Sequence, residues 1–277
     1  MRDVHGRDGG KTMVHVETGE WMDAPAPADR PIYAVGDVHG MASHLAALHG
    51  ALDLLIIAEA GSVRPLVVHL GDAIDRGPDG MRALRMALDW WHPDADATMV
   101  PGNHEQLLLA ALDAEDDDGG RAIGLWLHNG GSSVLYEIDC QARTAGGVRG
   151  EVRAALGEKR LARLRGSPAA VAEGRWLFVH AGVPDGASPA DVPAMEWHAP
   201  PEPGEAEASP LWVRDAFLDR TDPWPGSWVV LHGHTPTRGD PDVRAHRVNI
   251  DTGAFKTRRL TMAEIRGTAM RFHTAVG

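Results

Sequence analysis

Five short apolar runs in this chain each end in a glycine-flanked cluster of aspartate, asparagine or histidine, and this repeated pattern limits the folds open to the chain. The runs are four or five residues long and rich in valine and leucine, which is typical of buried strands. The runs with their clusters read PIYAVGDVHG (31–40), LVVHLGDAIDRG (66–77), ATMVPGNHE (97–105), WLFVHAG (176–182) and WVVLHGHT (228–235). In open α/β sheets ligands bind beyond the carboxyl ends of the strands, so we expect these clusters to converge in space.

Helical patterns separate the first three runs. Leucines recur at helical spacing over 43–59, and further helices are predicted over 78–92 and 104–113. Two later apolar runs, 247–250 and 259–265, are predicted as additional strands. Strands that alternate with helices in this way indicate the α/β class, with helices on the faces of a sheet.

The chain has 277 residues, enough for one large domain or two small ones. One domain is favoured, because clusters from Asp37 to His234 have to share a single site. We expect it to span 31–277 and to follow a flexible tail over 1–30. Irregular structure is predicted for the acidic segment 114–120, for the Gly/Arg-rich segment 144–150, and for a long loop over 183–210 that forms either a cap or a mobile insertion.

Composition excludes several functional classes. With 27 Lys and Arg against 39 Asp and Glu, the net charge of −12 disfavours binding to nucleic acid polymers and to membrane surfaces. The single cysteine, Cys140, cannot form an internal disulfide, which suggests a reducing compartment. No apolar run approaches the length of a membrane span and no signal peptide is recognisable, so a cytoplasmic protein is expected.

The residue types in the clusters suit divalent metal chemistry. A pair of divalent ions is held by a bridging carboxylate, with oxygen and imidazole ligands in the remaining positions. Asp, Asn and His without thiolate favour Mn, Fe or Zn over calcium or a structural zinc. Arg76 directly follows one cluster and can donate two hydrogen bonds to a phosphate oxygen pair.

The ordered set GDVHG, GDAIDRG, GNHE, HAG and HGHT resembles the metallophosphoesterase superfamily. Within it the set is similar to the phosphoprotein-phosphatase branch, which comprises lambda-type and bacterial serine/threonine phosphatases and is related to symmetrical diadenosine tetraphosphatase. The fragments WLHNGG (126–131), LWVRDAFL (211–218) and NIDTGA (249–254) also look like stretches of the bacterial members. The resemblance implies a calcineurin-like four-layer αββα sandwich with mixed β-sheets and a dinuclear metal site at the carboxyl ends of strands.

The resemblance also implies the metal ligands. Asp37 and His39 would bind the first metal, and Asp72 would bridge both. The second metal would be completed by Asn103, His180 and His234. His234 is preferred to His232 because it precedes Thr-Pro, as the family's ligand does. Two divalent ions are expected, with Mn²⁺ first and Fe, Zn, Co or Ni as alternatives.

The remaining site residues are assigned to substrate and proton transfer. By the same resemblance, Arg76, Arg214 and Asn103 would contact the phosphoryl group, and a metal-bridging hydroxide would attack phosphorus directly. Asp75 would orient His104, which would protonate the leaving oxygen. An Asp-His pair is expected to keep an imidazolium available near neutral pH.

The reaction implied is hydrolysis of phosphomonoesters, as in a serine/threonine protein phosphatase. A symmetrical dinucleoside polyphosphate hydrolase and a small-metabolite phosphatase stay open as alternatives, so the substrate is a phosphoprotein, a nucleotide or a small metabolite. A non-catalytic metal scaffold is disfavoured because both Asp75 and His104 are present. The sequence does not predict the oligomeric state.

Overall fold

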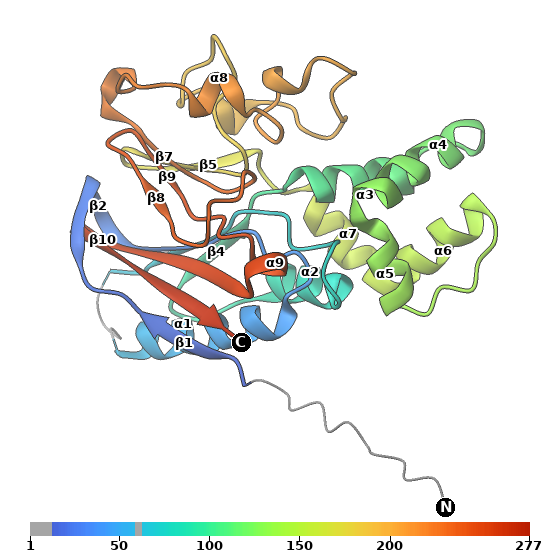
Figure 1. Cartoon of the computed structure of the whole chain (residues 1–277), viewed down its shortest axis with the longest axis horizontal. Coiled ribbons are helices and arrows are strands. Elements are labelled where there is room, and N and C mark those ends of the chain that lie inside the picture. The colour runs from blue at the N-terminus through green and yellow to red at the C-terminus, as the bar shows by residue number, and fades with distance from the viewer. Residues whose placement is uncertain (1–12, 59–62) are drawn as a thin grey trace, which may run out of the picture.

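Two five-stranded mixed sheets pack face to face in the computed structural model, which describes residues 13–58 and 63–277 (Figure 1). The first sheet has the order β1 (His15–Thr18), β10 (Arg259–Val276), β2 (Met22–Val35), β3 (Leu66–His69), β4 (Asp96–Met99). The second sheet has the order β5 (Ala170–Glu173), β6 (Trp176–Val179), β7 (Val229–His232), β9 (Arg247–Asn249), β8 (Asp242–Val243). The trios β2-β3-β4 and β6-β7-β9 are parallel, and antiparallel strands flank them.

Helices pack outside the first sheet: the first two contact its strands, and the later ones pack on the second helix and on one another. They are α1 (Ala42–Ala58), α2 (Gly80–Asp89), α3 (Asn103–Asp113), α4 (Asp116–Trp126), the π-helical turn η1 (Leu127–Gly131), α5 (Ser132–Glu137), α6 (Ala145–Leu156) and α7 (Glu158–Arg165). Among the described residues, the helices on the outer side of the second sheet are α8 (Asp215–Leu218) and the single-turn helices η2 (Val192–Ala194), η3 (Ala206–Ala208) and η4 (Pro225–Ser227). A short helix, α9 (Ala254–Thr257), precedes β10. The expected α/β sandwich is confirmed, although its fourth layer is mostly irregular.

The period-two alternation of side chains in β2 sets the layers. Ile32 and Ala34 point into the core between the two sheets, whereas Tyr33 and Val35 point into the core under the helices. All four are fully buried, as expected for a strand covered on both faces. The predicted strands and helices between 31 and 113 are confirmed and, apart from the earlier start of β2, their ends differ by at most three residues, the largest difference being the end of the helix predicted over 78–92.

The predicted tail over 1–30 is wrong where the structure describes it. β1 pairs with the end of β10, with Val16 opposite Ala275, and β2 already begins at Met22. The Ala-Pro stretch of β2 pairs irregularly with β10. Register shifts in this pairing accommodate prolines, which lack an N–H. Strand formation here depends on a partner more than 200 residues away, so no local pattern shows it. The first twelve residues of the predicted tail lie outside the described residues.

Two segments predicted to be irregular are helical. α4 begins at Asp116, inside segment 114–120. α6 begins at Ala145, where the Thr144 side chain accepts a hydrogen bond from Gly147 N, and it buries Val152 and Leu156 under the first sheet's helices. Burial of this apolar face outweighs the low helix propensity of its glycines.

Segment 183–210 is a long loop, as predicted, and is docked at several points. Ala181 N donates to Pro210 O at 3.1 Å, Trp197 Nε1 donates to Ser167 O at 2.9 Å, and Gln106 Nε2 donates to Ala199 O at 2.9 Å. These bonds dock the segment on the rest of the domain, whereas its role as a cap stays a prediction. Among the described residues, no helix is both long and apolar enough to cross a membrane.

Candidate metal centre and active site

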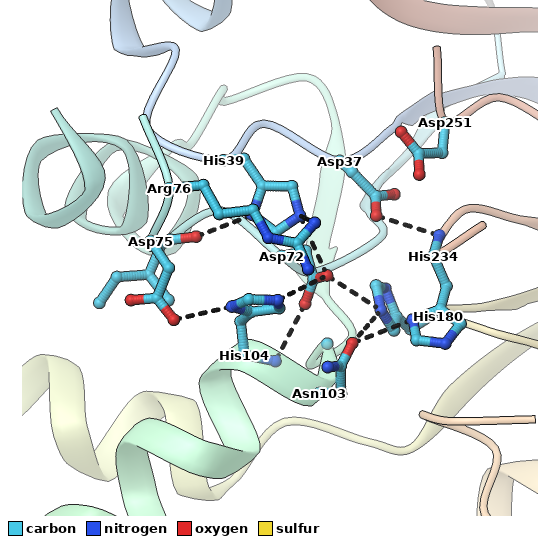
Figure 2. Close-up of polar contacts among 12 residues, drawn as sticks. Asp37, His39, Asp72, Asp75, Arg76, Asn103, His104, His180, His234 and Asp251 are labelled. Atoms are coloured by element: carbon cyan, nitrogen blue, oxygen red, sulfur yellow. Dashed lines mark hydrogen bonds and ion pairs between the residues drawn. The ribbon is translucent and has the colours of Figure 1, made fainter. Parts of the chain in front are cut away.

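The five clusters converge at the carboxyl ends of the parallel strands of both sheets. Asp37 and His39 follow β2, Asp72 follows β3, and Asn103 begins α3 after β4. His180 and His234 follow strands β6 and β7 of the second sheet. Figure 2 shows all of them pointing toward one centre. Residues almost 200 positions apart are in contact, since His234 N donates to Asp37 Oδ2 at 3.0 Å.

Asp72 lies in the middle of the cluster. Its Oδ2 is 3.4 Å from His39 Nε2 and 3.4 Å from His180 Nε2, while Oδ1 accepts a hydrogen bond from His104 N at 3.1 Å. Burial would raise the pKa of Asp72, but the imidazoles of His180 and His104 outweigh it and hold that pKa well below its usual value. An ionised carboxylate shared between two groups of histidines has the position that a bridging ligand needs.

Backbone carbonyls orient two of the histidines. His180 Nδ1 donates to Leu70 O at 2.7 Å and His39 Nδ1 donates to Ile74 O at 3.1 Å. When Nδ1 carries the proton, the Nε2 lone pair of the ring is free to bind a metal. In the case of His39, that lone pair faces Arg76 Nη1 at 2.9 Å.

Asn103 and His234 complete the second half of the cluster. Asn103 Oδ1 lies 3.1 Å from His180 Nε2 and 3.0 Å from His234 Nδ1. Together with Asp72, the two histidines form a group of buried ligands spaced for one cation, and His39, Asp72 and His104 form another. The predicted ligands are thus brought together, whereas His232 lies outside both groups and its ring packs edge-on against Phe217.

Unsatisfied buried atoms test whether cations fit. Asp37 Oδ1, His104 Nε2 and His234 Nε2 have no hydrogen-bond partner within the described parts of the chain. Leaving such atoms unpaired in the interior is costly, and the cost is recovered when a ligand binds. The donor set of carboxylate, amide and imidazole atoms therefore fits divalent cations.

Asp37 and Asp251 concentrate negative charge on one side of the cluster (Figure 2). Burial and the nearby Asp251 carboxylate raise the pKa of Asp37 well above its usual value, and burial also raises that of Asp251. Burial by itself lowers the pKa of His180, but Asp72 and Asp37 raise it to about 9. Sequence reasoning gave Asp251 no role, although the fragment NIDTGA that contains it had been singled out.

Asp75 and His104 form a buried pair. His104 Nδ1 lies 2.7 Å from Asp75 Oδ2, and neither side chain is exposed. Burial raises the pKa of Asp75 and lowers that of His104, so it favours the neutral form of both. The expected imidazolium at neutral pH is therefore not supplied by the protein alone, because burial opposes it. A phosphate dianion bound beside His104 would favour that protonated form.

The two predicted phosphate-binding arginines differ in position. Arg76 is exposed overall, but its guanidinium touches His39 beside the cluster and packs over the Phe255 ring at 5.2 Å. Arg214 is exposed and reaches the cluster through Thr235, whose Oγ1 accepts from Arg214 Nη1 at 3.2 Å. Because Thr235 follows His234 directly, Arg214 lies at the rim of the site.

Glu105 is a site residue whose role sequence reasoning missed. Its two carboxylate oxygens accept hydrogen bonds from four backbone N–H groups, those of Asp72, Ala73, Ile74 and Gly102, at 2.7 to 3.2 Å. These bonds hold the turn that presents Asp72, which has a φ of 46°. Its place after His104 in GNHE was a signal, but its contacts depend on the loop after β3.

Comparisons with known proteins agree with this geometry. A family model described as calcineurin-like phosphoesterase matches residues 30–256. Serine/threonine-protein phosphatase 1 of Salmonella typhimurium is 29% identical over 241 residues, which cover 85% of this chain and 92% of that protein. Serine/threonine-protein phosphatase 2 of the same organism is 24% identical over 261 residues, covering 91% of this chain and 100% of that protein.

Among solved structures, a cold-active protein tyrosine phosphatase superposes with a TM-score of 0.51 at 14% identity, covering 85% of this chain and 75% of that one. At this identity the likeness shows the fold alone. The family match, in contrast, spans most of the chain and includes every cluster from Asp37 to His234. The chain therefore belongs to the calcineurin-like phosphoesterase family and is a metal-dependent hydrolase that acts on phosphoesters.

Proposed function

We propose that this enzyme is a phosphoprotein phosphatase that hydrolyses phosphoserine and phosphothreonine monoesters. The observation that carries the proposal is the buried Asp75–His104 pair beside a cluster of metal ligands. An alkoxide leaving group, such as that of serine, needs a proton donor, whereas an activated leaving group does not. The similarity to serine/threonine-protein phosphatase 1 of Salmonella typhimurium over 92% of its length supports this substrate class.

Two divalent cations are assigned to the cluster. Asp37, His39 and Asp72 would hold one, and Asp72 would share the other with the amide and imidazoles of Asn103, His180 and His234. Mn²⁺ is proposed first because carboxylate, amide and imidazole donors without thiolate suit it. When bound, such a pair lowers the pKa of coordinated water and offsets the charge that develops on the phosphoryl group.

The chain's own residues then bind the substrate and transfer a proton. Arg76 holds phosphoryl oxygens from its position beside His39 and Arg214 holds them from the rim of the cluster, and the Asn103 amide N–H₂ can donate to the same group. His104 Nε2 has no hydrogen-bond partner among the described residues, so it can carry the proton given to the leaving oxygen. Asp75 keeps that ring oriented by accepting from Nδ1.

The test is a substrate panel with the purified enzyme and Mn²⁺, Zn²⁺, Co²⁺ or Ni²⁺ supplied separately. We expect turnover of p-nitrophenyl phosphate and of phosphoserine and phosphothreonine peptides, and near-complete loss of turnover in Asp72→Asn. His104→Ala should lose most of its activity on the peptides. Full activity of Asp72→Asn would overturn the metal assignment. A strong preference for diadenosine tetraphosphate, with release of nucleoside diphosphate, would instead indicate the dinucleotide hydrolase.

A further inference from the structure

The turn that carries Asp75 and Arg76 has an unusual backbone. Their φ angles are 70° and 65°, in the left-handed region that costs a residue other than glycine on the order of 1 kcal/mol. Two consecutive residues keep such angles only where their surroundings enforce them. The residues that hold this turn therefore also set the orientation of Asp75, the partner of His104.

Residues 126–137, which we name the support segment, make these contacts. Trp126, the last residue of α4, is 1% exposed, and its Nε1 donates to Asp75 at 3.0 Å from Oδ1 and 3.2 Å from Oδ2. Asp75 thus faces two ring N–H donors, one from Trp126 and one from His104. Figure 2 shows the Asp75 carboxylate pointing at the His104 ring, and the indole bond fixes the carboxylate in that direction.

Two glycines allow the support segment to approach so closely. Gly130 has a φ of 118°, its carbonyl accepts from Arg76 N at 3.2 Å, and a Cβ there would lie 2.9 Å from Arg76 Cγ. A Cβ on Gly131 would lie 2.4 Å from the Trp126 ring. At the end of the segment, the Glu137 carboxylate accepts from Met81 N and Arg82 N, which anchors the start of α2 directly after the turn.

We propose that Trp126 is a positioning residue for the reaction. Its indole N–H orients the Asp75 carboxylate, and Gly130 and Gly131 hold the turn and the ring in place, so that His104 faces the leaving oxygen. This role rests on the proposed function of His104 as proton donor, and it gives a purpose to the fragment WLHNGG, which contributes no residue to the two groups of metal ligands.

The conservative variant Trp126→Phe removes the N–H and keeps most of the ring. We expect kcat for a phosphoserine peptide to fall about 10- to 100-fold, the usual cost of losing a partner that orients a functional side chain, with KM unchanged. For p-nitrophenyl phosphate, whose leaving group needs little protonation, the loss should stay below about threefold. A purely structural defect would lower both rates alike.

Trp176→Phe is the matched control. Trp176 is fully buried between the sheets, and its Nε1 has no hydrogen-bond partner among residues 13–58 and 63–277. We expect equal effects on both substrates from this variant. If Trp126→Phe also lowers both rates equally, Trp126 is only a packing residue and the proposal is overturned.

A double-mutant cycle and a second variant complete the test. In a His104→Ala background, Trp126→Phe should cause no further loss on the peptide, because the indole acts through His104. Gly131→Ala, which displaces the ring without removing it, should show the same leaving-group dependence as Trp126→Phe and tests the role if that variant does not fold. If His104→Ala itself shows no leaving-group dependence, the proton donor of the proposed function is wrong. If His104→Ala does show it while Trp126→Phe and Gly131→Ala do not, only the role of Trp126 fails.

Discussion

Two buried carboxylate clusters in this protein have opposite electrostatics. Glu264 in β10 is fully buried, and its Oε2 accepts from Arg271 Nε at 2.5 Å and contacts His273 Nε2 at 2.7 Å, while Oε1 contacts Arg266 and accepts from Tyr33 OH. Burial would raise the pKa of Glu264, but the bonds to His273 and Arg271 outweigh it and lower that pKa. Asp37, equally buried, has a raised pKa because burial and Asp251 both act against its charge.

This difference distinguishes a carboxylate that is buried among cationic partners from one that is buried where a ligand can bind. The protein itself neutralises Glu264, whereas Asp37 has one oxygen without a hydrogen-bond partner among the described residues and a second carboxylate, Asp251, nearby. A buried charge that the surrounding protein does not fully compensate is tolerated in a core only where a ligand compensates it. We therefore expect added positive charge to stabilise the folded protein most on the Asp37 side of the site.

We expect the strongest effect from Asp37→Asn, because this variant removes the one of the two carboxylates that is a proposed metal ligand. Removing this ligand should lower kcat by about 10³ or more, because metal charge no longer offsets the transition state. The free energy of unfolding of the metal-free protein should stay equal or rise, since an unfavourable buried charge is lost. Steady-state kinetics and urea denaturation in chelator measure both. If metal-free Asp37→Asn is clearly less stable than metal-free wild type, the Asp37 carboxylate is not unfavourable in the fold and this interpretation is wrong.

The isosteric change at the other cluster, Glu264→Gln, should act in the opposite way. It leaves Arg271 and Arg266 without their buried carboxylate, so unfolding free energy should fall by about 3 kcal/mol, as when one partner of a buried pair is removed. kcat should stay within about twofold, because β10 supplies none of the proposed site residues. Urea denaturation and peptide turnover provide the two readings, and a loss of activity without a loss of stability would reverse the assignment.

Metal addition tests the difference between Asp37 and Glu264 through the stability of the protein. Mn²⁺ at about 100 times its Kd should raise the unfolding free energy of chelator-treated protein by about 2.7 kcal/mol. Asp37→Asn should gain much less at the same concentration, and Glu264→Gln should gain as much as wild type. Denaturation curves recorded with and without Mn²⁺ test this. Equal gains in wild type and Asp37→Asn would place the cation elsewhere.

The smallest effect is expected from pH. Because the folded-state pKa of Glu264 is below the ordinary value of 4.5, its stabilising contribution is complete above that pH. As pH falls below 4.5 the unfolded chain takes up the proton first, so the contribution is lost progressively down to the folded-state pKa. The stability gap between wild type and Glu264→Gln should therefore narrow from pH 5 toward pH 3.5, as followed by urea denaturation. A gap independent of pH would show that Glu264 is not ionised in the fold.

Local pattern predicted more of the site than of the fold. The convergence of the clusters from Asp37 to His234 was predicted because each follows a short apolar run, and the carboxyl ends of parallel strands lie at one edge of a sheet, whereas the role of each residue was implied by the family resemblance. β1 and the start of β2 were missed because their partner, β10, lies at the other end of the chain. α6 was missed because its glycines conceal an apolar face that only packing makes visible.

The roles of Trp126, Glu105 and Asp251 were out of reach for a related reason. Each acts through hydrogen bonds or charge toward a loop distant in sequence, and nothing in the residue type specifies that partner. Glutamate after histidine in GNHE, for example, is equally compatible with a surface position.

Which side chains meet follows from the order of residues in the chain, because strand ends in a parallel sheet converge whatever lies between them. How they meet depends on the folded protein: which histidine nitrogen stays free, which carboxylate oxygen has no hydrogen-bond partner among the described residues, and which indole holds Asp75. Those features depend on backbone angles and on contacts a few ångströms long between distant segments, and such contacts form only when the two sheets and their helices pack together.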